Sequence, residues 1–159
     1  WNVEENREWL GREIISQLPD GVKIDAVVQG VGTGGTLIGN AQALKQWHNP
    51  DLKVFAMEPS ESETLQCCIV ADHKIEGISD GFVPTIYQRH RDIVDHVISI
   101  DSDDAIEQAR KLCRQGLFTG PSSGANLLAA REIKRKDKSI NNILTFLCDR
   151  GSKYLSMMF

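Results

Sequence analysis

A glycine-rich loop is the segment of this chain whose residue types are best suited to chemistry. Residues 30–36 read GVGTGGT, and together with Gly39 they place five glycines within ten residues. Glycine adopts backbone angles that let several N–H groups point at one position, and such a nest at the start of a helix binds a phosphate group. The two threonine hydroxyls are further donors. We therefore predict a phosphate site formed by Gly32, Thr33, Gly34, Gly35 and Thr36.

Other interpretations of this loop have to be weighed. It carries no lysine, so it is not the P-loop of a nucleoside triphosphatase. A tight turn between a strand and a helix is the simplest structural alternative. Gly30, Gly32 and Gly35 also satisfy the GxGxxG pattern of dinucleotide-binding folds, and Glu58 ends the next apolar stretch much as a ribose-binding acid would. The spacing alone does not separate a dinucleotide from another phosphate ligand.

The surrounding sequence predicts strands that alternate with helices. Short apolar, β-branched stretches predict buried strands at 24–29, 52–57, 93–100 and 142–147. Apolar residues at three- and four-residue steps predict helices at 3–18, 37–47, 102–115 and 122–136, with Ser102 as an N-cap. This alternation is typical of the α/β class, with a parallel, doubly wound sheet in a three-layer αβα arrangement. Because such sheets bind ligands at the carboxyl ends of their strands, we expect the site in the loops after Gln29, Met57, Gly120 and Leu147.

The composition limits the class of protein. With 159 residues, 41% of them hydrophobic, the chain is long enough for one globular domain with a core. Its 18 basic and 22 acidic residues are interspersed and give a net charge of −4, so we expect no nucleic-acid partner. No apolar run approaches the length of a membrane span, which favours a cytoplasmic location without membrane association. The cysteines and histidines lack metal-binding spacing, so we predict no metal site and four reduced, buried structural thiols.

Four motifs, in order along the chain, resemble the cysteine synthase family of fold type II pyridoxal-phosphate enzymes. They are VGTGGTL at 31–37, KIEGISDGFVP at 74–84, GLFTGPSSGAN at 116–126 and CDRGSKYLS at 148–156. In that family the glycine loop holds the phosphate of pyridoxal 5′-phosphate. The string VFAMEPSES at 54–62 also matches the family better than a ribose site. The resemblance therefore favours this cofactor over a dinucleotide.

The resemblance also implies a partner for the cofactor's pyridine nitrogen. Ser122 is similar to the family serine that donates a hydrogen bond to that nitrogen, and a neutral hydroxyl there suits α,β-elimination. From the residues alone, Ser122 or Ser123 could instead cap the following helix, and the two roles are compatible. Asp149 is a further candidate for a position near the ring.

The resemblance places Gly77 and Ile78 on the substrate side of the cofactor. Two departures from the family pattern affect this region. Cys148 and Asp149 stand where many members have Pro and Ser, and Asp80 replaces a small residue. The wall of the site and its substrate side are therefore expected to differ from the usual family arrangement.

The lysine that forms the Schiff base with the cofactor's aldehyde is not found in this sequence. In the family, that lysine, an asparagine that contacts the ring oxygen and a Thr-Ser-Gly-Asn substrate loop all lie in the first half of the polypeptide. None of these strings occurs here, and the chain opens at Trp1 without a methionine. We therefore expect residues 1–159 to be one domain, the carboxyl-terminal half of a longer enzyme, and inactive alone. The less favoured alternative is a half that pairs with a separate chain.

The resemblance implies replacement of the β-substituent of an activated serine, O-acetylserine or O-phosphoserine, by sulfide to make cysteine. The implied partners are this amino-acid substrate, sulfide and the missing amino-terminal half, with a homodimer when the polypeptide is intact. Related reactions of the family stay open: those of cystathionine β-synthase, diaminopropionate synthase and serine or threonine dehydratase. Outside the family, the alternatives are an NAD-dependent oxidoreductase that uses the same loop and a non-catalytic regulatory fragment.

Overall fold

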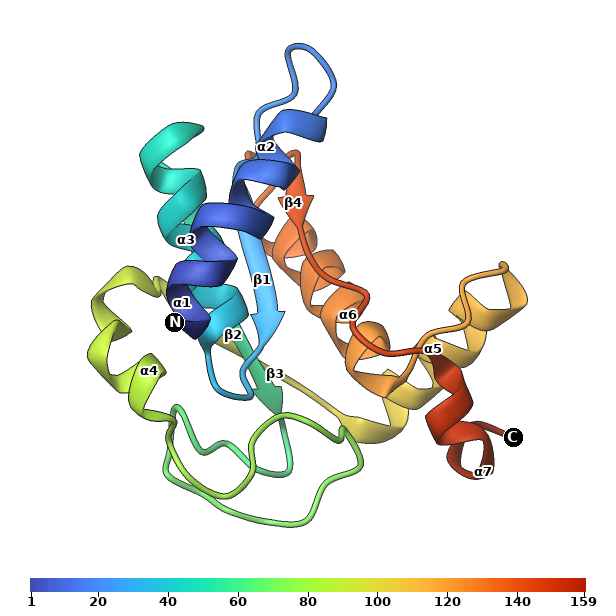
Figure 1. The fold of residues 1–159 in the computed structure, drawn as a ribbon. Coiled ribbons are helices and arrows are strands. Elements are labelled where there is room, and N and C mark those ends of the chain that lie inside the picture. Colours follow the sequence, from blue (N-terminus) through green and yellow to red (C-terminus); the bar gives the residue numbers. More distant parts are fainter.

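Four parallel strands form the centre of the molecule in a computed structural model that describes residues 1–159 (Figure 1). The strands lie in the order β3-β2-β1-β4, and every neighbouring pair is parallel. Their bounds are Ala26–Gly30 for β1, Lys53–Pro59 for β2, His96–Ile100 for β3 and Ile143–Leu144 for β4. All four strands were predicted, although β4 is much shorter than the expected 142–147.

Helices cover both faces of this sheet (Figure 1). One face carries α3 (Gly35–Trp47) and, packed on it, α1 (Asn2–Glu5), a π-helical segment (Asn6–Gly11) and α2 (Arg12–Gln17). The other face carries α5 (Ser102–Arg114) and α6 (Pro121–Lys136). The predicted three-layer α/β fold is therefore confirmed.

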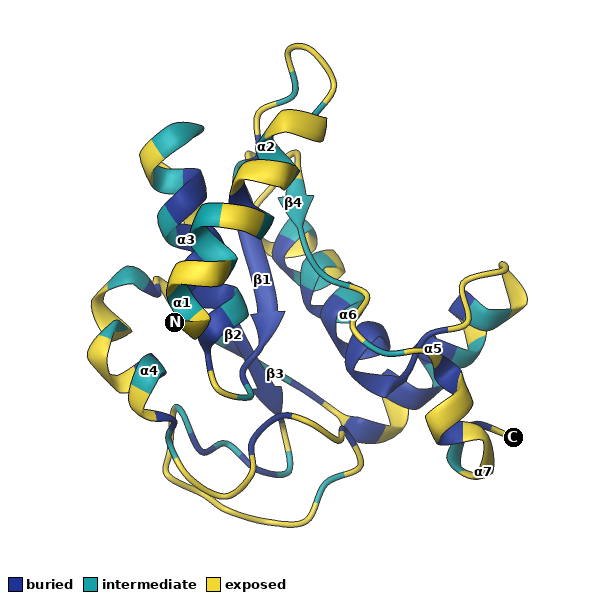
Figure 2. Cartoon of the chain, in the orientation of Figure 1, coloured by how far each residue is buried: buried dark blue, intermediate teal, exposed yellow.

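The sheet separates two hydrophobic cores, and the alternation of side chains along β1 explains why. Val27 packs with Leu37 and Ile38 of α3, whereas Ala26 and Val28 belong to the cluster on the α6 side. Successive side chains of a strand point to opposite faces, so an apolar residue is needed at each position of a strand covered twice. Figure 2 shows β1 and the inner faces of α3 and α6 as buried, whereas the edge strand β4 is only partly buried.

Four short helices lie in segments where the sequence predicted none. They are α4 (Thr85–Arg89), a 3-10 turn (Arg91–Ile93), a second 3-10 turn (Gly151–Tyr154) and α7 (Leu155–Met158). Each is at most five residues long, too short for a helical periodicity to show in the sequence. None of the helices in the molecule combines the length and apolar character needed to cross a bilayer.

The N-cap predicted for α5 is wrong by one residue. The Asp101 carboxylate accepts hydrogen bonds from the amides of Asp103 (2.8 Å) and Asp104 (3.0 Å) and so caps the helix. The Ser102 hydroxyl instead accepts from the Lys74 amide at 2.9 Å, which anchors the segment that leads to Gly77.

The cysteines are free, as predicted, but their expected burial is wrong. Cys67, Cys68 and Cys148 are exposed, and Cys113 is partly buried. Cys67 and Cys68 lie in the irregular segment after β2, outside both cores.

Candidate functional site

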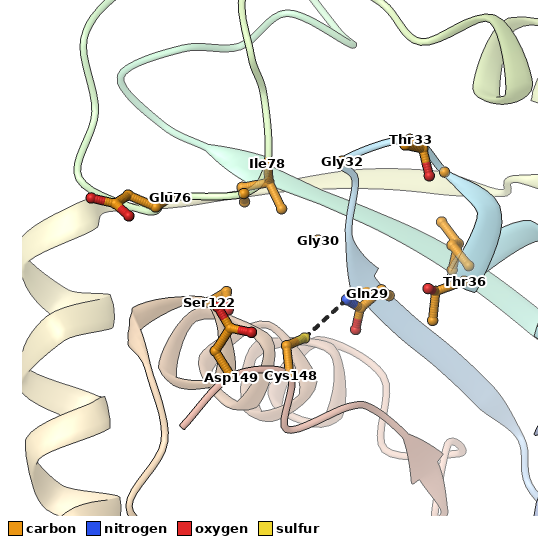
Figure 3. A pocket seen from close by; sticks show the side chains of 13 residues that line it. Gln29, Gly30, Gly32, Thr33, Thr36, Glu76, Ile78, Ser122, Cys148 and Asp149 are labelled. Atoms are coloured by element: carbon orange, nitrogen blue, oxygen red, sulfur yellow. Dashed lines mark hydrogen bonds between the residues drawn. The ribbon is translucent and has the colours of Figure 1, made fainter. Parts of the chain in front are cut away.

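A cavity of about 290 Å³ opens at the carboxyl end of β1 (Figure 3). It lies among the glycine loop, the segment 76–78, the start of α6 and residues 148–149. All four loops that the sequence predicted as the site therefore contribute to it. Its lining residues are Gln29, Gly30, Gly32, Thr33, Gly34, Thr36, Leu37, Glu76, Gly77, Ile78, Ser122, Cys148 and Asp149.

The cavity brings together every predicted site residue except Gly35. It also contains Gln29, Gly30, Leu37, Glu76 and Cys148, which were not assigned to the site from the sequence. Gln29 could have been predicted as a site residue from the sequence, because it is the one polar residue in an otherwise apolar strand that leads into the glycine loop. Gly30 and Cys148 were noted in the sequence, as part of the glycine pattern and as a departure from the family, but were given no role in the site, and nothing in the local sequence sets Leu37 or Glu76 apart.

Unpaired backbone amides line the glycine-loop side of the cavity. Gly34 has a left-handed backbone (φ +89°), and α3 begins directly after it. The amides of Gly32, Thr33, Gly34, Thr36 and Leu37 donate no hydrogen bond within the chain, and all five residues line the cavity. The first amides of a helix have no partner inside the helix, and the positive end of its dipole attracts negative charge. This set of donors fits a phosphate dianion.

The amide of Gly35 has a different use. It donates to the Thr33 hydroxyl oxygen at 3.3 Å, and Gly35 does not line the cavity. The predicted phosphate contact of Gly35 stays a prediction, and in this structure Gly35 acts within the loop. It closes a short turn that orients Thr33.

The glycine loop and the segment around Gly77 contact each other closely. A Cβ added to Gly32 would lie 2.6 Å from the carbonyl oxygen of Gly77, which no side chain can tolerate. Gly77 itself has a left-handed backbone (φ +85°), which favours glycine. The two walls of the cavity are therefore held together by backbone contact, and Gly32 has to be glycine for steric reasons.

Ser122 and Ser123 lie side by side at the start of α6 but face different partners. The N-cap of α6 is Gly120, and no side chain caps this helix, so neither serine takes the capping role left open by the sequence. Ser123 accepts a hydrogen bond from the Cys148 amide at 2.9 Å. Ser122 is buried and lines the cavity, and its hydroxyl has no hydrogen-bond partner within the chain.

Asp149 is fixed by the residues that follow it. Its carboxylate accepts a 2.6 Å hydrogen bond from the Tyr154 hydroxyl and lies 3.6 Å from the Lys153 ammonium group. Burial, and then this hydrogen bond, raise the pKa of Tyr154 well above its ordinary value. Tyr154 therefore stays protonated and donates to Asp149 throughout the neutral pH range.

A buried amide network forms the floor of the cavity. Asn126 accepts a hydrogen bond from the Gly30 amide (2.9 Å) and donates to the Gln29 side chain (2.8 Å) and the Phe146 carbonyl (2.9 Å). Gln29 in turn donates to the Cys148 sulfur at 3.3 Å (Figure 3). The end of β1, the start of α6 and the segment after β4 are thereby joined beneath the site.

Glu58 is not available to bind a ribose. Its carboxylate is buried and accepts hydrogen bonds from the Leu65 amide (2.6 Å) and the Gln66 side chain (3.0 Å). Burial raises the pKa of Glu58, against the lowering effect of the Leu65 amide. This side chain holds the loop after β2 and does not line the cavity. Glu58 therefore cannot supply the ribose-binding acid that the dinucleotide alternative requires.

Comparisons with known proteins agree with this geometry. Residues 1–149 match the protein family described as pyridoxal-phosphate dependent enzyme. Cysteine synthase B of Campylobacter jejuni is 36% identical over 157 residues, which cover 98% of this chain and 50% of that protein. The chain thus spans about half the length of the curated relatives it matches.

Two solved structures superimpose closely on this chain. A hydrogen sulfide-producing enzyme from Fusobacterium nucleatum has a TM-score of 0.90 at 38% identity, with 98% of this chain and 46% of that one covered. A cysteine synthase from Entamoeba histolytica has a TM-score of 0.88 at 35% identity, with 98% and 45% covered.

Proposed function

Since the chain belongs to the pyridoxal-phosphate-dependent enzyme family, we propose that its cavity holds the phosphate and the ring nitrogen of pyridoxal 5′-phosphate. The observation that carries this proposal is the set of five unpaired amides, those of Gly32, Thr33, Gly34, Thr36 and Leu37, on one side of the cavity. An anion with several acceptor oxygens is the ligand that such amides bind best.

The residues opposite the loop suit the rest of the cofactor. The free hydroxyl of Ser122 would donate to the pyridine nitrogen and, being neutral, would leave that nitrogen unprotonated. Asp149, held by Tyr154, would lie beside the ring, and Gly77 and Ile78 would face the substrate. When bound, the cofactor supplies the electron sink that activates the substrate's α-carbon.

We further propose that the lysine partner of the cofactor's aldehyde lies outside residues 1–159. No lysine lines the cavity and none occurs in the glycine loop, while Lys74 and Lys153 pair with Asp103 and Asp149. Residues 1–159 would then act as the carboxyl-terminal half of the catalytic unit, which supplies the phosphate and ring-nitrogen contacts and is inactive alone.

The reaction that we propose for the whole protein is replacement of the β-substituent of an activated serine by sulfide to give cysteine. The support is the 36% identity to a cysteine synthase and the close superposition on a second one. A specific observation favours a second candidate, release of sulfide from cysteine, because the hydrogen sulfide-producing enzyme is 38% identical. A homodimer, implied by the family resemblance, and a cytoplasmic location, favoured by the lack of a long apolar run, stay predictions.

A titration of the full-length protein tests the proposal. We expect added pyridoxal 5′-phosphate to give the visible absorbance band of a Schiff base, and binding of NAD without that band would contradict it. Sulfide consumption with O-acetylserine, compared with sulfide release from cysteine, then separates the two candidate reactions. An intact mass greater than that of residues 1–159 for the active protein supports the division into halves.

A further inference from the structure

The hydroxyl of Thr33 receives hydrogen bonds from two donors. The side-chain amide of Asn2 donates to Thr33 Oγ1 at 3.0 Å, and the Gly35 backbone amide donates to the same atom at 3.3 Å. A hydroxyl has two acceptor lone pairs and one proton. Because both lone pairs are used, the Thr33 proton has to be donated elsewhere.

The direction of the Asn2 amide is fixed by its neighbours. Asn6 Nδ2 lies 2.9 Å from the Asn2 backbone carbonyl, which can only accept, so this atom of Asn6 is a donor. The same Nδ2 lies 3.1 Å from Asn2 Oδ1. Asn2 therefore presents its oxygen to Asn6 and its NH₂ group to Thr33, and the reverse orientation would place two donors against each other.

Close packing brings Asn2 to the loop. A Cβ on Gly35 would lie 1.9 Å from Asn2 Oδ1, and a Cβ on Gly39 would lie 2.5 Å from the Val3 carbonyl oxygen. Two glycines on one side of α3 thus let the first helix approach within hydrogen-bond reach of Thr33. This contact joins residues 31 positions apart in the sequence.

We propose that Asn2 is a positioning residue that makes Thr33 an obligatory hydrogen-bond donor toward the cofactor phosphate. Thr33 lines the cavity, and its proton is the part of the hydroxyl left free to reach an anion there. The hydrogen bonds from Asn6 to Asn2 and from Asn2 to Thr33 thus fix the hydroxyl as a donor before the phosphate binds. It would act together with the five unpaired amides of the loop. This inference rests on the proposed function, because it requires the phosphate to sit in the glycine loop.

A double-mutant cycle tests the inference on the full-length protein. The dissociation constants of pyridoxal 5′-phosphate and of pyridoxal, which lacks the phosphate, are measured for the wild type, Asn2→Ala, Thr33→Val and the double variant. We expect Asn2→Ala to weaken phosphorylated-cofactor binding by about five- to tenfold, as for one hydrogen bond, and to leave pyridoxal binding unchanged. In the Thr33→Val background the same change should have an effect of less than about twofold.

Two further variants sharpen the test. Asn2→Asp keeps the shape but replaces the donor with a carboxylate, which would draw the Thr33 proton to itself, so it should weaken binding more than Asn2→Ala. Glu5→Ala, on the same helix and without a side-chain hydrogen bond, is the control and should leave both dissociation constants unchanged.

The outcomes separate this inference from the proposed function. An equal loss from Asn2→Ala in both backgrounds, or an equal loss for both ligands, would overturn the role of Asn2 while leaving the phosphate site intact. A wild-type protein that binds pyridoxal as tightly as its phosphate ester would overturn the phosphate site, and with it the inference.

Discussion

The carbonyl oxygen of Gly77 lies against the Cα of Gly32, so that a Cβ on Gly32 would stand 2.6 Å from it. This contact joins the two walls of the cavity, the glycine loop and the segment that carries Glu76, Gly77 and Ile78. It does so through backbone atoms, which leaves no flexible side chain to yield. The width of the cavity between the proposed phosphate and substrate sides therefore depends on a residue without a side chain.

Gly32→Ala is expected to push these walls apart. The added methyl should cost about 1–3 kcal/mol of stability, as other overpacked sites do, and should weaken pyridoxal 5′-phosphate binding at least about tenfold. Urea unfolding and a cofactor titration measure the two effects. Gly116→Ala is the control: Gly116 is left-handed (φ +91°) and lies away from the cavity, so the variant should lose stability and keep cofactor affinity. Wild-type affinity in Gly32→Ala would contradict the contact.

Thr36→Ala is expected to weaken retention of the cofactor's phosphate. Thr36 lines the cavity in the first turn of α3, where its hydroxyl can make a charge-assisted hydrogen bond worth about 1–3 kcal/mol. The matched variant Thr85→Ala removes an exposed hydroxyl at the start of α4 and should change nothing. Equilibrium dialysis against pyridoxal 5′-phosphate gives both affinities. Equal values for the two variants would remove Thr36 from the site.

The neighbouring serines of α6 should respond in opposite ways to the same change. Ser122→Ala should weaken cofactor binding by about 1 kcal/mol and leave stability unchanged, because its hydroxyl has no partner within the chain. Ser123→Ala should cost about 1 kcal/mol of stability, because the Cys148 amide loses its acceptor. Thermal unfolding without cofactor and a cofactor titration compare the pair. If Ser122→Ala lost stability and kept affinity, its assignment to the pyridine nitrogen would be wrong.

The hydrogen bond between Tyr154 and Asp149 predicts a loss of stability in alkali. The pKa of Tyr154 is raised above its ordinary value of 10.0, so the folded state favours the protonated phenol. Its contribution is complete below pH 10 and is lost as the pH rises through 10 toward the folded-state pKa. Tyr154→Phe should be less stable at pH 8, by about 1–2 kcal/mol. Above pH 10, however, its stability should fall less steeply than that of the wild type. Urea unfolding of both proteins between pH 9 and pH 11 measures this difference. If their unfolding free energies fell equally with pH, Tyr154 would have no such role.

The sequence predicted those parts of the fold that depend on local pattern. The buried strands β1 and β2 are continuous apolar stretches, and α5 and α6 have clear helical periodicity, so their places were found to within two residues. Strand β4 is shorter than predicted because the chain leaves the sheet after Leu144. At this point the Thr145 hydroxyl donates a hydrogen bond to the Val28 carbonyl at 2.8 Å, and the following residues lead to the cavity. Such a departure is set by tertiary contacts, which the apolar pattern of 142–147 does not record.

The candidate site likewise contains residues that the sequence predicted and residues that only the structure reveals. The glycine loop was singled out by its residue types and spacing, and Ser122 and Asp149 by the family resemblance. The partners that orient them, Asn2 for Thr33 and Tyr154 for Asp149, were not, because each is defined only by a contact that the fold creates. Gly35 shows the opposite case: it was predicted to contact the phosphate, and in this structure its amide is used within the loop.

The central claim is that the free amides of Gly32, Thr33, Gly34, Thr36 and Leu37 bind the phosphate of pyridoxal 5′-phosphate. A crystal structure of the full-length protein with this cofactor measures it most directly. We expect phosphate oxygens about 2.7–3.2 Å from several of these five nitrogens, the range of N–H···O hydrogen bonds. A phosphate bound elsewhere, with these amides facing only water, would contradict the claim.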